Sequence, residues 1–67
     1  MKLIVNNREE IIDRESLNIT ELLEEKKFSF KMLVIKVNGQ LIKKPEYNST
    51  QLKDGDDVMV LHLISGG

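Results

Sequence analysis

The residues best placed to do chemistry stand at the C-terminal end, in the run Ser65-Gly66-Gly67. Glycine has no Cβ, so two consecutive glycines can pass through a narrow active-site channel and leave a terminal carboxylate unhindered. A nucleotide-using partner could convert that carboxylate into an acyl-adenylate, which a sulfur nucleophile would then attack. Because the sequence contains no cysteine, sulfur could be carried covalently only through such an acyl group. A frayed end without function is the simpler interpretation, and composition alone does not separate the two.

Other catalytic or metal-binding chemistry finds little support in the remaining residues. The adjacent carboxylates Glu9-Glu10, Glu24-Glu25 and Asp56-Asp57 have no histidine beside them, and they fit solvated faces and turns. The single histidine, His62, has no acid or nucleophile placed by a motif, so we expect a strand side chain near the sheet edge. One histidine without cysteine also disfavours a structural zinc site. We therefore expect no catalytic residue, no metal and no permanently bound cofactor.

The size and charge of the chain argue against several further classes of protein. Its 67 residues can form one modest core, which leaves little room for a deep catalytic pocket. Ten basic and eleven acidic residues are spread along the chain, without the basic patch and stacking aromatics of nucleic-acid binding. Its longest apolar runs are far shorter than the roughly 20 residues of a membrane span. The sequence predicts a cytoplasmic protein, monomeric when free, that binds neither nucleic acid nor a membrane.

Two hairpins and a last strand are predicted from hydrophobic runs and turn residues. Leu3 to Val5 and Ile11-Ile12 fit strands around Asn6-Asn7, because asparagine tolerates positive φ. Leu33 to Val37 and Gln40 to Ile42 flank Asn38-Gly39, the strongest signal for a type I′ hairpin turn. A turn at Asp54-Gly55-Asp56 then introduces a last strand, from Asp57 to about Ile64.

A single helix is predicted from about Ile19 to Lys27. Asn18 can cap its first turn, and Glu21 lies where its carboxylate can reach back to the Asn18 amide. Apolar side chains recur at helical spacing on one face, and the aliphatic stem of Lys26 can extend this stripe. The element order is therefore β-β-α-β-β-β, an α+β domain over residues 1–64 with a flexible tail at 65–67.

This order of elements and the Gly66-Gly67 end resemble the ubiquitin-like β-grasp proteins, and more closely the ThiS-type sulfur carriers of thiamine biosynthesis. The resemblance covers the whole chain and is most specific in Val37 to Ile42, Pro45-Glu46-Tyr47, Leu52 to Val58 and Ser65-Gly66-Gly67. It implies a mixed sheet of four to five strands with one helix packed across one face. Ser65 stands where the family often has alanine or glycine, and Lys43-Lys44-Pro45 replaces a Val-Pro-Arg-like step.

The resemblance implies a carrier, not an enzyme. In such a cycle, an adenylyltransferase related to ubiquitin-activating enzymes uses ATP to adenylate the terminal carboxylate, which is that of Gly67 here. A sulfur donor system then converts the adenylate into a thiocarboxylate, and thiazole synthase takes the sulfur for the thiazole ring of thiamine. Ser65 and Gly66 would present the tail to these partners.

Two alternatives to this function stay open. The small subunit of molybdopterin synthase has the same fold and tail, but it is usually longer and often has a proline-containing stretch before the tail. A ubiquitin-like protein modifier or non-covalent binding module is the other alternative, in which Gly67 forms an isopeptide bond or has no role. Genome neighbours would distinguish these functions.

The alternation of the last strand predicts a surface for partner enzymes. Successive side chains point to opposite faces, so Val58 and Val60 share one face and the odd-numbered residues share the other. Both sets are apolar, yet one helix covers only one face of the sheet. The resemblance places Val58 and Val60 beneath the helix. The opposite face then exposes an apolar patch, which marks a binding site or a surface for self-association. This predicted patch consists of Ile4, Met59, Leu61 and Leu63.

Overall fold

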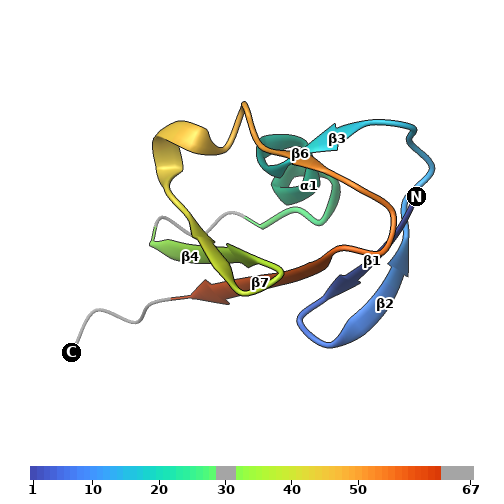
Figure 1. The fold of residues 1–67 in the computed structure, drawn as a ribbon, viewed down its shortest axis with the longest axis horizontal. Helices are drawn as coiled ribbons and strands as arrows, with labels where there is room; N and C mark the ends of the chain where they lie inside the picture. Colours follow the sequence, from blue (N-terminus) through green and yellow to red (C-terminus); the bar gives the residue numbers. More distant parts are fainter. Residues whose placement is uncertain (29–31, 63–67) are drawn as a thin grey trace.

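The computed structural model describes residues 1–28 and 32–62 and contains a five-stranded mixed sheet with a helix on one face (Figure 1). The strands are β1 (Lys2–Val5), β2 (Arg8–Ile11), β4 (Leu33–Val37), β5 (Gln40–Ile42) and β7 (Asp57–His62), in the spatial order β2-β1-β7-β4-β5. Strand β7 runs parallel to β1 and antiparallel to β4. The helix α1 spans Ile19–Glu25, and a single 3-10 turn, η1, spans Lys44–Glu46. The predicted α+β class, mixed sheet and covering helix are confirmed.

Two tight turns set the register of the outer hairpins. Asn6 and Asn7 have φ of 51° and 66°, and Asn38 and Gly39 have φ of 51° and 82°, as a type I′ turn requires. Each turn has two residues, so pairing resumes immediately after it. The second strand therefore begins at Arg8 and ends at Ile11, earlier than predicted, and Ile12 is a buried residue beyond it.

Gly39→Val is expected to lower the free energy of unfolding by about 1–3 kcal/mol. No atom lies within 4 Å of a Cβ built at Gly39, so the loss comes from forcing a β-branched residue to φ +82° and not from a clash. Urea titration of the variant measures it. Gly39→Asn is the matched control, because asparagine adopts positive φ more readily. Equal losses in the two variants would contradict this assignment to backbone strain.

The start of α1 matches the predicted capping box. Asn18 Oδ1 accepts a hydrogen bond from the Glu21 amide at 2.8 Å, and Glu21 Oε1 accepts one from the Asn18 amide at 2.9 Å. Leu17 and Leu22, the predicted staple across this cap, are both fully buried. The helix N-terminus is thus fixed by two reciprocal hydrogen bonds and an apolar contact region beneath them.

The end of α1 comes earlier than predicted. The helix stops at Glu25, Lys26 is its C-cap residue, and Lys27 takes the left-handed conformation with φ 57°. The prediction was too long because nothing in the run of good helix formers marks this conformation. Lys26 Nζ pairs with Glu10 of β2 at 2.8 Å, so its stem lies along the domain while its charge meets a carboxylate.

The capping carboxylate is expected to make stability depend on pH. The hydrogen bond from the Asn18 amide, together with the Arg14 guanidinium, lowers the pKa of Glu21 below its ordinary 4.5. A pKa that is lower in the folded than in the unfolded state contributes stability above 4.5, and this contribution is lost as pH falls through the folded pKa. In urea unfolding, wild type should lose more stability than Glu21→Gln between neutral pH and about pH 3. Identical pH dependence in the two proteins would contradict this role.

One core fills the space between the sheet and α1. Its members are fully or nearly fully buried and come from both layers: Leu3, Val5, Ile12, Leu17, Ile19, Leu22, Ile35, Leu52, Val58 and Val60. After the parallel pair of Val5 with Val58, Asn6 forms the next hydrogen bonds to β7. Its N–H donates to the Val58 carbonyl at 2.9 Å, and its Oδ1 accepts the Val60 N–H at 2.7 Å. A turn residue of the first hairpin thereby holds the middle of the last strand.

Two short strands were not predicted. Strands β3 (Leu17–Asn18) and β6 (Gln51–Leu52) form a separate two-stranded sheet on the same side as α1 (Figure 1). Two-residue segments are too short to show alternation in a sequence. Their pairing of Leu17 with Leu52, both buried, closes the core where the chain enters the helix.

Candidate functional site

The tail predicted to do the chemistry follows directly on β7. Leu63, Ser65, Gly66 and Gly67 lie outside the described residues, so the structure shows the strand that leads to them. That strand is central in the sheet, between β1 and β4, and its last residue, His62, pairs with Leu33. The pairing of β7 with β1 covers only Asp57 and Val58, so His62 lies beyond it at the end of the sheet, in agreement with the predicted strand side chain near the sheet edge.

The start of β7 is fixed by a network of carboxylates and one amide. Asp54 Oδ1 accepts the backbone N–H of Lys2 at 2.6 Å, which joins the turn before β7 to β1. Asp56 Oδ1 accepts from Asn38 Nδ2 at 3.0 Å, and Asn38 Oδ1 accepts the N–H of Asp57 at 2.9 Å. These acidic residues therefore work as turn and strand anchors, as their sequence context predicted.

The two faces of β7 divide as predicted. Val58 and Val60 are 0% and 6% exposed beneath α1, whereas Leu61 is 42% exposed on the helix-free face. Ile4 and Met59 share that face and are half-buried. The structure thus brings three of the four predicted patch residues to one face, and the fourth, Leu63, is outside the described residues.

The helix-free face contains three further apolar residues that were not predicted for it: Val34, Leu41 and, on the outer strand β2, Ile11. Val34 pairs with Leu61 across β4 and β7, and Leu41 of β5 pairs with Lys36, itself the partner of Met59. Leu41 is 52% exposed. Alternation along β4, combined with the two-residue turn, could have placed Val34 and Leu41 on this face. We call Ile4, Val34, Leu41, Met59 and Leu61 the sheet patch.

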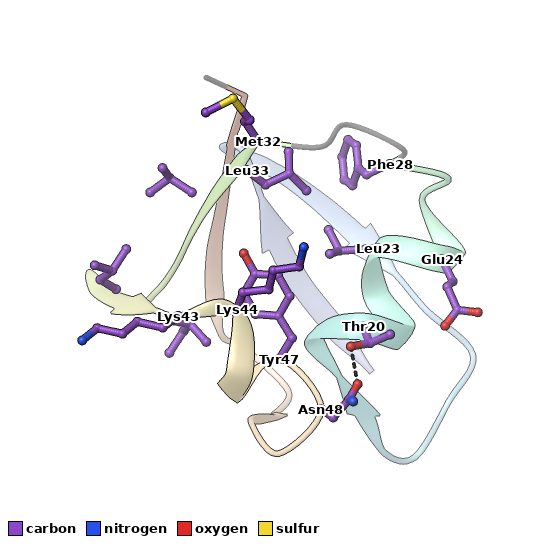
Figure 2. A pocket seen from close by; sticks show the side chains of 13 residues that line it. Thr20, Leu23, Glu24, Phe28, Met32, Leu33, Lys43, Lys44, Tyr47 and Asn48 are labelled. Atoms are coloured by element: carbon purple, nitrogen blue, oxygen red, sulfur yellow. Dashed lines mark hydrogen bonds between the residues drawn. The ribbon is translucent and has the colours of Figure 1, made fainter. Parts of the chain in front are cut away.

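A groove opens beside the sheet patch, between α1, the start of β4 and η1 (Figure 2). It has a volume of about 920 Å³, and we call it the edge groove. Its apolar lining includes Leu23, Phe28, Met32, Leu33, Ile42 and Tyr47. Lys43 and Lys44 line it from η1 and the residue before, and Glu24 lines it from the helix. Nothing in the sequence pattern predicts this groove.

One end of the edge groove is closed by polar contacts between the helix and the segment after η1. Thr20 Oγ1 donates to Asn48 Oδ1 at 2.5 Å, and the Ile19 amide donates to the Tyr47 carbonyl at 3.1 Å. Partial burial raises the pKa of Tyr47 above its ordinary value of 10, so its hydroxyl remains protonated at neutral pH. The groove lining therefore combines the neutral hydroxyls of Thr20 and Tyr47 with the cationic side chains of Lys43 and Lys44.

Neither a metal site nor a membrane-spanning helix is present in the described ranges. Residues 1–28 and 32–62 contain no group of three or more histidine, aspartate or glutamate side chains that could hold a metal ion. Within these ranges, no helix has both the length and the apolar character needed to cross a bilayer.

A five-stranded mixed sheet with a central C-terminal strand, covered by one helix, defines the ubiquitin-like β-grasp class. The model of the ThiS family matches residues 2–67, and the chain therefore belongs to the ThiS family. The crystal structure of a thiamine biosynthesis protein (ThiS) from Geobacter metallireducens is similar over 100% of both chains, with 36% identity and a TM-score of 0.89. An NMR solution structure of a thiamine biosynthesis protein from the same organism matches with 36% identity and a TM-score of 0.83. That match covers 100% of this chain and 88% of the other.

Proposed function

We propose that the chain is a sulfur carrier of thiamine biosynthesis, with the Gly67 carboxylate as the group that carries the sulfur. The observation that supports this most directly is the family match over residues 2–67, which includes the Gly66-Gly67 end. Full-length similarity to the Geobacter ThiS structure at 36% identity supports the same role. The chain is a carrier without catalytic side chains, and the chemistry belongs to its partners.

The proposed cycle has two transfers at one carboxyl group, that of Gly67. A carboxylate oxygen of Gly67 attacks the α-phosphorus of ATP in an activating enzyme, and pyrophosphate leaves. The product is a mixed anhydride between Gly67 and AMP. Hydrosulfide supplied by a donor system then attacks the carbonyl carbon and loses its proton, and AMP leaves with the electron pair of the broken C–O bond. The resulting thiocarboxylate is the group from which thiazole synthase takes sulfur.

Two features of the described residues support this cycle: the pairing of β7, which leads to the tail, and the apolar surface beside that strand. β7 pairs with β1 at its start and with β4 from Val58 to His62, so the point from which residues 63–67 begin is held against β4. The sheet patch lies on the helix-free side of the same strand and offers apolar area to a partner. Residues 65–67 would then enter the active-site channel of that partner with the small side chain of Ser65 and no other Cβ.

Mass spectrometry tests the proposed modification. The purified chain is incubated with the activating enzyme of its host, Mg-ATP and a sulfide source. Tandem spectra should place the exchange of one oxygen for sulfur on Gly67, since methionine oxidation gives nearly the same nominal mass. Adenylate formation without any sulfur transfer, but with isopeptide products, would indicate a protein modifier instead.

A further inference from the structure

Exposed apolar side chains gather on the β4–β5 side of the sheet, with Ile11 of the outer strand β2 as the exception. In the described ranges, the large apolar residues with high exposure are Ile11, Met32, Leu41 and Leu61. Met32 and Leu41, 49% and 52% exposed, line the edge groove. Leu61 pairs with Val34, which also lines it. The edge groove and the sheet patch therefore form one continuous apolar surface around the β5 side of the sheet.

The edge groove meets β4 from the side, at a strand edge. Leu33 and Val34 point to opposite faces of the sheet, as do Leu41 and Ile42, yet all four line the groove. A groove bordered by both faces of two strands runs past their edge. Pairing of β4 with β5 ends at Ile35 and Ile42, after which the chain turns away into η1.

The backbone of Leu33 is directed at this groove. Further along β4, the Asn38 amide donates to the Asp57 carbonyl of β7 at 2.7 Å. Backbone groups alternate sides along an antiparallel strand, so even-numbered residues of β4 bond to β7 and odd-numbered residues face β5. The N–H and C=O of Leu33 therefore point toward the β5 side, where the described chain provides no strand partner for them. An unpaired strand edge of this kind can accept an extended peptide.

The charge on the groove favours an acidic occupant. Lys43 and Lys44 are exposed on the η1 side, and neither takes part in the ion pairs of residues 1–28 and 32–62. Glu24 is the one acidic side chain among the described lining residues, and the Glu46 carboxylate, outside the lining, accepts the backbone N–H of Lys43 at 2.9 Å. A segment that fits must be extended, with an apolar side chain for the floor and a carboxylate near the lysines.

We propose that the edge groove is a second docking site for the adenylating enzyme, occupied by an extended, acidic and apolar segment of that enzyme. This segment pairs with the backbone of Leu33 and directs a carboxylate to Lys43 and Lys44. The inference rests on the proposed function, because the occupant is the enzyme that activates Gly67.

Position and area both support this occupant. Leu33 pairs with His62, so the groove lies at the end of the sheet where residues 63–67 begin. An enzyme that binds an unactivated carboxylate must place it by non-covalent contacts alone. A stable interface removes about 800 Å² from each partner, which is about a sixth of the 4890 Å² accessible surface here. Ile4 and Met59 are half-buried, so the sheet patch alone offers only part of this interface area. An enzyme that also contacts the edge groove would bury the rest.

The charge arm of the test compares Lys44→Glu with Lys53→Glu, an equal charge change at an exposed residue outside the groove. The readout is ATP–pyrophosphate exchange by the adenylating enzyme at increasing carrier concentration. Lys44→Glu should raise KM roughly tenfold with little change in kcat, and added salt should raise KM of wild type more than KM of the variant. Lys53→Glu should remain near wild type.

The backbone arm uses chemically synthesised chains with one N-methylated residue. N-methyl-Leu33 removes the donor that faces the groove and keeps the side chain. N-methyl-Glu9 is the matched control, because the Glu9 amide lies on the outer edge of β2. We expect a raised KM for N-methyl-Leu33 only, with wild-type thermal unfolding in both chains. If N-methyl-Leu33 does not fold, Lys44→Glu decides alone.

The outcomes separate the two proposals. If Lys44→Glu gives the same KM as Lys53→Glu while wild type supports exchange, the docking site is wrong and the carrier function stands. A fall in kcat at unchanged KM would also overturn it, because docking would then be intact. If wild type supports no exchange at all, the proposed function and the docking site are both wrong.

Discussion

Deletion of Gly67 is expected to abolish ATP–pyrophosphate exchange and thiocarboxylate formation, with no change in the thermal unfolding midpoint. The reaction needs a terminal carboxylate that reaches the α-phosphorus of ATP. Removal of one residue shortens the tail, so the new terminal carboxylate no longer reaches the nucleotide. The core residues that the structure describes end at Val60, so the deletion removes none of them. Calorimetry and the exchange assay on the same preparation measure both effects.

Gly67→Ala is the control that keeps the length of the tail. It should unfold like wild type but be adenylated poorly, because the added Cβ crowds a channel shaped for glycine. A large loss of stability in either variant would show that the tail belongs to the packed structure and would contradict its role as a presented group. Normal adenylation of the deletion would place the reactive group elsewhere.

Leu61→Glu is expected to weaken binding to the activating enzyme and to thiazole synthase while the domain stays folded. Leu61 is 42% exposed on the helix-free face, so a carboxylate there remains hydrated in the free protein but is desolvated in a complex. Titration calorimetry with each enzyme measures the change in affinity. We expect Kd to rise at least tenfold, which corresponds to a loss of roughly 1.4 kcal/mol of binding free energy.

Val60→Glu is the matched variant on the opposite face of the same strand. Val60 is 6% exposed in the core beneath α1, so its replacement buries a charge without a partner. The cost of several kcal/mol is comparable with the roughly 5 kcal/mol stability of a small domain, and the variant should be largely unfolded. If Leu61→Glu unfolds the protein and Val60→Glu is tolerated, the two faces are assigned in reverse. A wild-type chain that sediments as a dimer, and a monomeric Leu61→Glu, would show that the sheet patch serves self-association.

The parts of the fold that were predicted from sequence are those fixed by local chemistry. Asn38-Gly39 has few conformations other than a type I′ turn, and Asn18 with Glu21 satisfies the first helix amides without help from the rest of the chain. The two faces of β7 follow from alternation once a single helix is expected. These features need only neighbouring residues.

The parts that were missed depend on contacts between distant residues. The left-handed Lys27 ends α1 where local propensity would continue it. Strands β3 and β6 exist because Leu17 meets Leu52, and two residues each give no periodic signal. The edge groove depends on the point at which the pairing of β5 with β4 ends, and no local sequence pattern predicts that point. The sequence therefore predicted the sheet patch in part and the groove not at all.

The central position of β7 links tail presentation to completion of the whole fold. The other four strands of the five-stranded sheet, β1, β2, β4 and β5, cannot form that sheet alone, because in the described chain β1 and β4 are joined through β7. During synthesis, the two hairpins emerge from the ribosome well before the strand that joins them. The hydrogen bond from the Val60 N–H to Asn6 Oδ1 also cannot form until Val60 has been synthesised, 54 residues later. A nascent, truncated or damaged chain therefore lacks a fixed origin for residues 63–67. An activating enzyme that must bind the sheet beside the tail would therefore use ATP only on carriers that have finished folding.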